Sequence, residues 1–404
     1  MRLPGSKSMT QRALLLAALA YGDSQLYDIG LCEDTLTFMQ ALKSLGIDLS
    51  YHEETQRCCV RGCGGVFPNA QARLWCQDSG ITLRFLLAVC AAQQGQFSFD
   101  GSARLCARPL RALVEVLHQQ GVNTSSAQLP LCIQTSGLEG GQIFIPGEES
   151  SQFLSALLIA APLMKRAVTL QTGKLVSQPY VAMTTRMQQQ FGVSVAQRED
   201  VWHIETGQSY QACDYTIESD LSSASYFFAW AAVMGRDIFI EGVDRQACLQ
   251  GDIEFLSVLE CMGCVVEQQS LGVKVIGPTQ LRGVEVDMRD MSDTMMTLAA
   301  IAPFADRPTI IRNIANTRLK ESDRIEAMAY NLRALGIRVE ANQDSLVIYP
   351  GVVKPAELSS YGDHRIAMAC GVIAAKVPDI EIDGGACVAK TFPHFFELLN
   401  RLVK

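Results

Sequence analysis

The sequence predicts an α/β protein of two lobes, each built from three copies of a β-α-β-α-β-β repeat. Three observations lead to this prediction: the length, a helix-glycine-strand pattern that recurs, and a second set of helices that are apolar on every face. A length of 404 residues exceeds what one hydrophobic core serves, because domains average roughly 150 residues. The hydrophobic content of 48% and charged content of 19% are typical of a well-buried globular chain.

The first recurring element is an amphipathic helix that ends at a glycine and runs into a short β-branched strand. Its five copies cover residues 38–46, 113–121, 183–192, 255–263 and 328–336. The closing glycines lie 75, 71, 71 and 73 residues apart. A glycine at this place can adopt the left-handed conformation that caps a helix C-terminus. A sixth amphipathic helix, residues 395–402, ends the chain.

The second recurring element is a helix that is apolar on all faces and rich in small residues, which indicates complete burial. These helices start near Ser6, Asp78, Ser150, Asp220, Met291 and Gly362, at intervals of 72, 72, 70, 71 and 71 residues. Six repeats divide into three and three, with a boundary in the composition shift at residues 212–219. A solenoid has the same kind of period, but a one-layer solenoid has less reason to bury a helix on every side.

Charge and composition exclude several classes of protein. The formal net charge of −8 disfavours nucleic-acid and anionic-membrane partners. No apolar run reaches the ~18 residues of a membrane span, and the N-terminus lacks a secretory signal. We therefore expect a cytoplasmic protein, and we expect a monomer. Cysteines in apolar runs, Cys90, Cys106 and Cys370, are expected to be reduced core thiols.

Metal binding is not expected. Cys261 and Cys264 form the one pair with metal-ligand spacing, and no second pair or histidine lies near them in sequence. The histidines His52, His118 and His203 have no ligand spacing between them and are interpreted as solvated or packed side chains.

Polar residues begin every buried helix, where free backbone N–H groups make an anion site. Serine, aspartate and threonine could be N-caps and nothing more. Caps alone do not require the cations Lys7, Arg12, Arg84 and Arg365 beside them. Further basic residues gather at 104–109, 316–324 and 389–393, and a solvated loop is the simple alternative for 316–324. We expect these cations to repel one another until a small polyanion with several phosphates or carboxylates binds.

Seven motifs in order along nearly the whole chain resemble the enolpyruvyl transferase family, in particular the branch that acts on shikimate 3-phosphate. They are Leu3-Pro4-Gly5-Ser6-Lys7-Ser8 with Arg12, Arg108-Pro109, Ser150-Ser151-Gln152, Ser177-Gln178-Pro179-Tyr180, Lys320-Glu321-Ser322-Asp323-Arg324, Asp363-His364-Arg365 and Ala389-Lys390-Thr391-Phe392-Pro393. The resemblance implies two lobes whose buried helices converge on the interlobe cleft. It also implies that residues 1–5 join 219–404 in the C-terminal lobe, leaving 6–218 as the N-terminal lobe.

The resemblance implies transfer of the carboxyvinyl group of phosphoenolpyruvate to the 5-hydroxyl of shikimate 3-phosphate, with release of phosphate. This step belongs to the shikimate pathway to chorismate and aromatic amino acids, and it needs no metal or organic cofactor. The residues implied for shikimate 3-phosphate are Lys7, Ser8, Arg12, Ser150, Ser151, Gln152, Ser177, Tyr180, Asp293, Asn316 and Lys320. The residues implied for phosphoenolpyruvate are Lys7, Gly80, Arg108, Gln152, Arg324, Arg365 and Lys390.

The catalytic candidates are Asp293, Glu321 and Lys7. Asp293 is the candidate base for the 5-hydroxyl, whereas Lys7, Glu321 and Lys390 are candidates for proton delivery to the methylene carbon. One departure from the family is Asp78-Ser79-Gly80-Ile81, where many members have Asn-Ala-Gly-Thr, so the pocket beside phosphoenolpyruvate can differ in shape and charge.

Two other functions compete with this one. The transferase that uses UDP-N-acetylglucosamine as acceptor has a reactive loop cysteine five residues before an Arg-Pro, where this chain has Ala103. A two-lobed solute-binding protein is the non-enzymatic alternative, and the candidate acid–base residues Asp293 and Glu321 argue against it.

Overall fold

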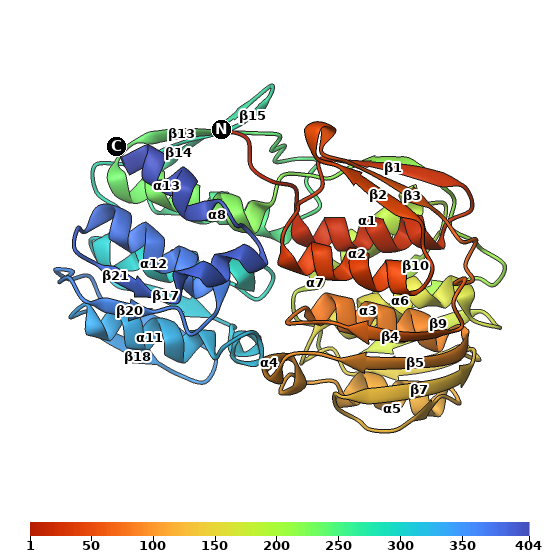
Figure 1. Cartoon of the computed structure of the whole chain (residues 1–404). Helices are drawn as coiled ribbons and strands as arrows, with labels where there is room; N and C mark the ends of the chain where they lie inside the picture. The colour runs from red at the N-terminus through yellow and green to blue at the C-terminus, as the bar shows by residue number, and fades with distance from the viewer. Residues whose placement is uncertain (404) are drawn as a thin grey trace. The chain divides into compact units, whose positions relative to one another are not determined.

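The computed structural model describes residues 1–403, which form two compact units. The N-terminal unit is Gly5–Ile217, and the C-terminal unit is Met1–Pro4 together with the chain from Glu218 onward. These boundaries differ by one residue at each crossing from those expected from the sequence. In Figure 1 the N-terminal unit runs from red to yellow-green, and the C-terminal unit is mostly green to blue.

The N-terminal unit has three four-stranded sheets with one shared topology. The second sheet has the order β4-β5-β7-β6 and the third has β8-β9-β11-β10. In both, the first two strands are parallel and the others antiparallel. The bounds are β4 Gln71–Trp75, β5 Gln94–Asp100, β6 Asn123–Thr124, β7 Leu131–Ser136, β8 Gly141–Ile145, β9 Val168–Thr172, β10 Ala196–Arg198 and β11 Val201–Ile204.

In the first sheet of this unit, the leading strand comes from the end of the unit's sequence and the other three come from its beginning. Its order is β12-β1-β3-β2, and β12 is parallel to β1. Thus β12 takes the place that β4 and β8 hold in their sheets. The strands are β1 Asp23–Tyr27, β2 Leu49–His52, β3 Arg57–Arg61 and β12 Asp214–Thr216.

The C-terminal unit has three sheets of four, three and two strands. Their orders are β16-β17-β19-β18, β13-β15-β14 and β20-β21. Beside β13, the Met1 amino group donates to the Phe239 carbonyl (2.6 Å) and the Met1 carbonyl accepts from Glu241 N (3.0 Å). The strands are β13 Asp237–Glu241, β14 Val265–Gln269, β15 Gly272–Ile276, β16 Glu285–Asp287, β17 Thr309–Arg312, β18 Val339–Ala341, β19 Leu346–Ile348, β20 Glu357–Ser359 and β21 Glu381–Asp383.

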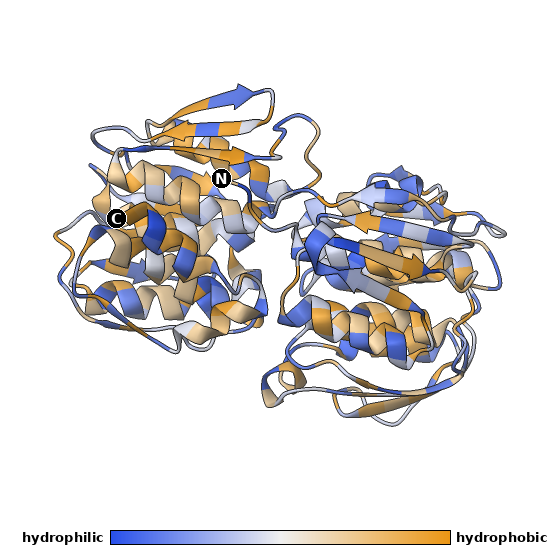
Figure 2. Cartoon of the chain, turned by 45° about the horizontal axis from the view of Figure 1, so that its top comes forward, coloured by the Kyte–Doolittle hydropathy of each residue, from blue (hydrophilic) through white to orange (hydrophobic). Residues whose placement is uncertain are grey.

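Six helices form the centres of the two units, three in each. All twelve residues of α3 and thirteen of the fourteen of α8 are buried, which matches a helix that is apolar on every face. Figure 2 shows the orange, hydrophobic residues of these helices. They are α1 Lys7–Leu19, α3 Gly80–Ala91, α6 Ser151–Ala160, α8 Leu221–Met234, α10 Met295–Ile301 and α12 His364–Lys376.

The second class of helix ends as the sequence predicts. Gly46, Gly121, Gly192, Gly263 and Gly336 all have positive φ, between 82° and 103°. The amide after each glycine donates to the carbonyl five residues earlier, as Ile47 N does to the Leu42 carbonyl (3.1 Å), which is the Schellman cap. The helices are α2 Glu33–Ser44, α5 Arg111–Gln119, α7 Gln178–Gln190, α9 Phe255–Cys261 and α11 Arg324–Ala334, with α13 Phe395–Val403 last.

Two local expectations are wrong. The residues after Gly192 do not enter a strand at once, because β10 begins only at Ala196. Cys106 is not in a buried helix: it ends the short α4 (Ala103–Cys106) and is half-buried. Cys90 and Cys370 are buried, and burial raises the pKa of Cys370 to about 12.

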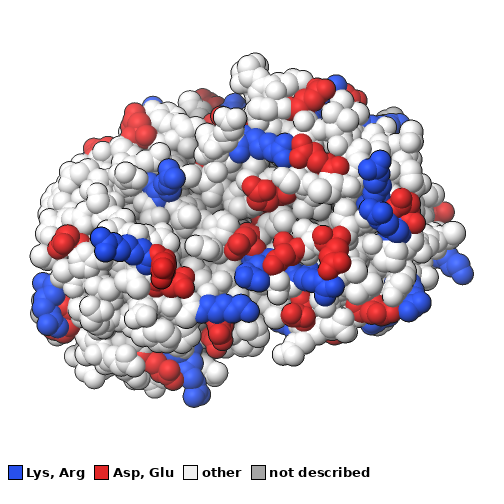
Figure 3. All heavy atoms as spheres, turned by 180° about the vertical axis from the view of Figure 1, so that it is seen from behind, with Lys and Arg blue, Asp and Glu red and all other residues white. Residues whose placement is uncertain are grey.

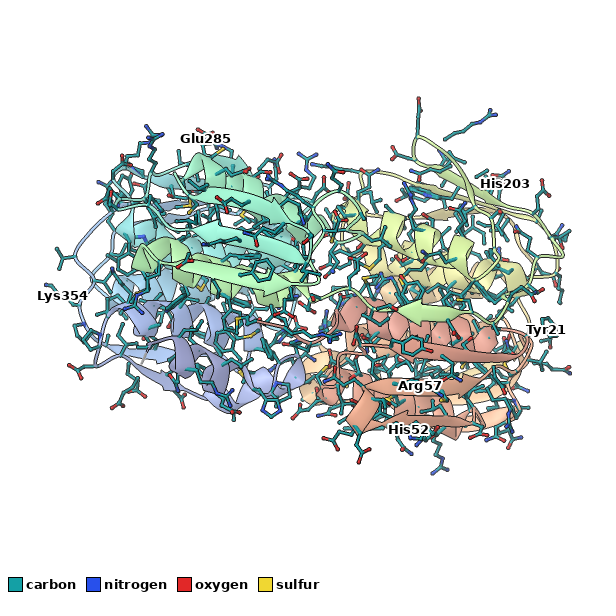
Figure 4. All side chains as sticks on the ribbon, turned by 90° about the horizontal axis from the view of Figure 1, so that it is seen from above. Tyr21, His52, Arg57, His203, Glu285 and Lys354 are labelled. Carbon is teal, nitrogen blue, oxygen red and sulfur yellow. The ribbon has the colours of Figure 1, made fainter. Side chains whose placement is uncertain are left out.

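The surface carries mixed charge. On the face in Figure 3, Lys and Arg atoms are interspersed with Asp and Glu atoms. Figure 4 labels His52 and Arg57, which pair across β2 and β3. It also labels His203 of β11, whose Nδ1 lies 3.0 Å from Oγ1 of Thr169 on the neighbouring strand β9. Within residues 1–403, no helix is long and apolar enough to span a bilayer.

Candidate functional site

The N-terminal ends of α1, α3 and α6 meet inside the N-terminal unit. Gln11 Nε2 of α1 donates to Ser79 Oγ, the N-cap of α3, at 3.1 Å. Arg84 Nη1 of α3 donates to Gln152 Oε1 of α6 at 2.7 Å. The sequence predicts this convergence, and these bonds show that three helix dipoles present their positive ends to one region of the unit.

Lys7 is held in this region by a carboxylate that the sequence analysis missed. Its Nζ lies 2.9 Å from Asp34 Oδ2, and both side chains are largely buried. Asp34 lies in the first turn of α2, and its backbone carbonyl accepts from Gln11 Nε2 (3.2 Å). The adjacent acidic residues Glu33 and Asp34 at a helix start were the available signal, but acidic residues are common there for the helix dipole alone.

Gly80 and Arg108 are in direct contact at the start of α3. A Cβ added to Gly80 would lie 2.9 Å from Arg108 Nη1 and 3.0 Å from its Cζ. The guanidinium therefore packs on the first backbone turn of the helix, and a residue with a side chain at this place would push it away. Both residues were assigned from the sequence to one ligand, and the structure brings them together.

Arg12 is a buried cation with neutral partners. Its Nε donates to Thr184 Oγ1 (2.8 Å), Nη1 to the Ser8 carbonyl (3.0 Å) and Nη2 to the Tyr180 carbonyl (3.3 Å). Its Cζ lies 5.0 Å from the centroid of the Phe85 ring. Among residues 1–403 no carboxylate pairs with it, and burial lowers the pKa of Arg12 to about 10.

The remaining candidates of this unit lie at the starts of α6 and α7. Ser150 caps α6, and its Oγ accepts from Gln152 N (3.2 Å), while Ser151 is the first residue of that helix. Ser177 is buried with a left-handed backbone (φ 54°) immediately before α7. Thr184, one turn after Tyr180, was not a candidate, because nothing in the sequence singles out its hydroxyl.

Asp293 is the centre of the C-terminal unit's cluster. It lies in the 3-10 turn η4 (Ser292–Thr294) before α10. Its Oδ1 accepts from Arg324 Nη1 and its Oδ2 from Arg365 Nη2, both at 3.0 Å, and Lys320 Nζ is 4.0 Å away. Burial alone would raise the pKa of Asp293, but the charges of Arg365, Lys320 and Arg324 outweigh it and hold that pKa well below its usual range.

Arg324 has three carboxylate partners. Beyond Asp293, its Nε donates to Asp363 Oδ2 (2.8 Å) and its Nη2 to Glu321 Oε2 (2.9 Å). Burial would lower the pKa of Arg324, but Asp363, Glu321 and Asp293 raise it above its usual value. The expectation that the cations repel one another without a ligand is therefore wrong for this cluster, because carboxylates neutralise them.

Three more candidates surround this cluster. Asn316, in η6 (Ala315–Leu319), donates from Nδ2 to Ser292 Oγ (3.1 Å). Lys390 is a buried residue at the end of η7 (Gly385–Lys390). Arg365 also donates from Nη2 to Ser222 Oγ (3.2 Å), a residue of α8 that the sequence analysis did not assign. Asp363, which belonged to a motif but was not assigned, caps α12 by accepting from Arg365 N.

The described residues contain no group of three or more His, Cys, Asp or Glu side chains arranged to hold a metal ion. The chemistry that these clusters can supply comes from fixed cations, helix N-termini and the carboxylate of Asp293, which its cations keep ionised. Such groups suit a substrate with phosphate and carboxylate groups and a hydroxyl to be deprotonated.

The fold is that of the enolpyruvyl transferases. A solved structure of the enolpyruvyl transferase NikO from Streptomyces tendae matches with a TM-score of 0.78, covering 100% of this chain and 94% of that one, at 18% identity. Within this class, the chain belongs to the EPSP synthase (3-phosphoshikimate 1-carboxyvinyltransferase) family, whose sequence model matches residues 1–399.

Relatives from bacteria and from a plant support the same family membership. A 3-phosphoshikimate 1-carboxyvinyltransferase of Nostoc sp. is 44% identical over 99% of this chain and 96% of its own length. The chloroplastic enzyme of Arabidopsis thaliana is 40% identical over 100% of this chain and 82% of its own. An EPSP synthase structure from Acinetobacter baumannii has a TM-score of 0.82 at 26% identity, with coverage of 99% and 94%.

Proposed function

We propose that this chain transfers the carboxyvinyl group of phosphoenolpyruvate to the 5-hydroxyl of shikimate 3-phosphate and releases phosphate, a step toward chorismate and aromatic amino acids. Family membership over nearly the whole chain supports the activity. The observation that carries the chemistry is Asp293, an ionised carboxylate held between Arg324 and Arg365 at 3.0 Å from each.

The proposed first step is attack by the 5-hydroxyl oxygen on C2 of phosphoenolpyruvate. Asp293 takes the hydroxyl proton, and an acid among Lys7, Glu321 and Lys390 delivers a proton to the methylene carbon C3. This gives a tetrahedral adduct whose C2 carries both the former 5-hydroxyl oxygen and the phosphate. Loss of phosphate, with removal of a proton from the new methyl group, restores the double bond and completes the transfer.

The basicity of Asp293 depends on its cations. While Arg324 and Arg365 both bond to it, Asp293 is a weak base because its pKa is far below the usual range. We propose that phosphoenolpyruvate, held by Arg108, Arg324, Arg365 and Lys390, draws the guanidinium groups toward its own phosphate and carboxylate. Asp293 then gains basicity when the substrate is present, and the same cations stabilise the leaving phosphate.

The proposed acceptor site uses the unbalanced charge of Arg12. A buried guanidinium without a carboxylate partner favours an incoming anion, because that anion supplies the missing charge. Ser8, Ser150, Ser151, Ser177, Gln152 and Tyr180 are the other proposed ligands of shikimate 3-phosphate in this unit. In the C-terminal unit the proposed ligands are Asn316, Lys320 and Asp293. Lys7 is proposed to serve both substrates, and Gly80 to leave room for phosphoenolpyruvate beside Arg108.

The test is phosphate release by purified protein, measured with each substrate alone and with both. We expect release only with both substrates, and none when UDP-N-acetylglucosamine replaces shikimate 3-phosphate. The matched control is Asp287→Asn, an exposed carboxylate paired with Arg289 at 3.3 Å, which should leave the rate unchanged. Turnover with the nucleotide sugar, or none with shikimate 3-phosphate in folded protein, would contradict the proposal.

We propose further that the protein acts in the cytoplasm as a monomer. Buried thiols such as Cys76, Cys90 and Cys370 support a reducing compartment, because these cysteines are packed as small apolar residues. Fractionation of the source cells tests the compartment, and light scattering at micromolar concentration tests the oligomeric state. Recovery in an organelle or a mass near twice 44.1 kDa would contradict these two statements.

A further inference from the structure

A second carboxylate, Asp252, is linked to Arg365 through the hydroxyl group of Ser222. Arg365 Nη2 donates to Ser222 Oγ at 3.2 Å, and Ser222 Oγ in turn donates to Asp252 Oδ2. Ser222 lies in the first turn of α8, whereas Asp252 lies in the 3-10 turn η3 (Gly251–Glu254). The same nitrogen also donates to Asp293 Oδ2 (3.0 Å), so Ser222 and Asp293 together fix the position of the guanidinium.

Asp252 is a buried carboxyl group of which only one oxygen is hydrogen-bonded within residues 1–403. Its side chain is 5% exposed, and its Oδ1 has no hydrogen-bond partner among the described residues. Three factors raise the pKa of Asp252: its burial, the nearby charge of Asp293, and the charge of Asp220, which is the N-cap of α8. Two factors lower it: the charge of Arg365 of α12 and the hydrogen bond from Ser222. The net result raises the pKa of Asp252 to about 7.

We propose that Asp252, acting through Ser222, positions Arg365 for the phosphoenolpyruvate anion and takes up a proton from the solvent when that anion binds. The inference rests on the proposed function, because it requires Arg365 to be a phosphoenolpyruvate ligand. Asp252 is a positioning residue, since the cluster gives it no contact with the reacting groups except through Ser222 and Arg365.

The direction of proton movement follows from charge. In the free protein, Arg365 is the cation that favours the ionised form of Asp252. An anion bound to Arg365 offsets that cation and adds negative charge nearby, so Asp252 becomes easier to protonate. The proton comes from buffer, and Oδ1, the oxygen without a partner, is the atom free to receive it. Ser222 keeps its bond to Oδ2 in either state, so Arg365 stays in place.

Linkage turns this into a dependence on pH. A ligand that raises the pKa of a group binds more tightly when the group is already protonated. Affinity for phosphoenolpyruvate should therefore be highest at low pH and fall as the pH rises above about 7, where free Asp252 is ionised. Ionisation of the ligand's own phosphate adds a separate dependence, which is common to wild type and variants and cancels in their comparison.

The test uses three variants of the full chain and one control variant. Asp252→Asn removes the titration but keeps an oxygen that can accept from Ser222. Ser222→Ala removes the link to Arg365 and keeps the carboxyl group, whereas Ser222→Thr restores a hydroxyl. Glu254→Gln is the matched control, because it removes one acidic group from the same turn at an exposed position. Urea unfolding checks that each variant is folded.

The first measurement is titration calorimetry of phosphoenolpyruvate in buffers of different ionisation enthalpy, which counts protons. Wild type and Glu254→Gln should take up about half a proton more per site at pH 7 than Asp252→Asn, because a group with a pKa near 7 is half protonated there. Infrared difference spectra should show a protonated carboxyl group on binding in wild type and not in Asp252→Asn.

The second measurement is the KM for phosphoenolpyruvate against pH. Asp252→Asn should match wild type near pH 6 and bind more tightly at higher pH, by up to about tenfold for each pH unit between the free and bound pKa values. Ser222→Ala should raise KM at every pH while changing kcat less, and Ser222→Thr should restore it.

Each outcome bears on the inference. Equal proton uptake by wild type and Asp252→Asn, or a KM that worsens uniformly in Asp252→Asn, would overturn it, because a structural role alone predicts uniform loss. If phosphoenolpyruvate does not bind even to wild type and no turnover occurs, the proposed function itself fails, and the inference with it. Normal turnover with unaltered proton counts would remove the inference alone.

Discussion

Arg12 in the N-terminal unit and Arg324 in the C-terminal unit are equally buried, each with 1% of its surface exposed, but their charges are balanced in opposite ways. Arg12 is surrounded by two carbonyls, a hydroxyl and two aromatic rings. Arg324 is enclosed by Asp293, Glu321 and Asp363. Burial consequently lowers the pKa of Arg12 to about 10, while the carboxylates raise that of Arg324.

This difference in charge balance shows that the burial of an arginine does not by itself define its role. The charge of Arg12 is uncompensated in the protein, so a ligand anion can balance it. The charge of Arg324 already holds Asp293 in a fixed place and ionisation state, so part of its role is structural. Substitutions at these two positions should therefore separate binding from stability.

The largest expected effect is a loss of turnover when Asp293, the carboxylate bound by Arg324, is replaced by a neutral amide. Asp293→Asn should lower kcat by about 10²–10⁴, the usual cost of losing an acid–base group, with a smaller change in the KM for phosphoenolpyruvate. Steady-state kinetics against Asp287→Asn as control measure this. A kcat near that of wild type would show that another group is the base.

Arg324→Met should destabilise the protein far more than Arg12→Met. It leaves Asp293, Glu321 and Asp363 without their shared cation, and removal of one partner from a buried ion pair typically costs about 3–5 kcal/mol. Arg12→Met removes a cation that has no carboxylate partner, so its cost should be much smaller. Urea unfolding of both variants checks the contrast, and equal losses of stability would mean that the two sites are not balanced differently.

Arg12→Met should instead weaken binding of shikimate 3-phosphate. Hydrogen bonds to charged groups contribute about 1.5–3 kcal/mol, so we expect the Kd to rise by roughly 10- to 100-fold. Calorimetric titration of the folded variant measures the change, with Arg186→Met, a position on the same helix as Tyr180, as control. An unchanged Kd would exclude Arg12 from the acceptor site.

The smallest effect concerns Gly80, which contacts a third arginine, Arg108, at the start of α3. Gly80→Ala adds a methyl group 2.9 Å from Arg108 Nη1, so the guanidinium must move by a few tenths of an ångström. We expect the KM for phosphoenolpyruvate to rise by about tenfold, the lower range for overpacking, with little change in that for shikimate 3-phosphate. The reverse pattern of KM changes would place Arg108 with the other substrate.

The repeat was predictable from sequence because its signals are local. Gly46 and its four counterparts need a left-handed backbone, and α3 and α8 are apolar all round, so periodicity alone revealed six units. The pairing of β12 with β1 was not predicted, since β1 lies almost 200 residues earlier in the chain. A strand of three residues is also too short to show a hydrophobic pattern in the sequence.

The cations of the site were predictable for a similar reason, because Lys7, Arg108 and Arg365 stand next to helix starts or in marked motifs. Two of the carboxylates beside them, Asp34 and Asp252, were not predictable. Asp34 and Asp252 are ordinary acidic residues of a first helical turn until folding places them beside Lys7 and Ser222. The balance of charge that distinguishes Arg12 from Arg324 is a property of tertiary contacts, so sequence spacing could not reveal it.

The most direct test of the central claim is phosphorus NMR of the protein with phosphoenolpyruvate and shikimate 3-phosphate. We predict that the phosphoenolpyruvate signal is replaced by inorganic phosphate one for one, while the 3-phosphate of the shikimate ring stays esterified and its resonance shifts as the carboxyvinyl ether forms. Asp293→Asn should show the same products at a far lower rate. Phosphate released from shikimate 3-phosphate, or loss of phosphoenolpyruvate phosphate without a change in the 3-phosphate resonance, would contradict transfer and indicate hydrolysis instead.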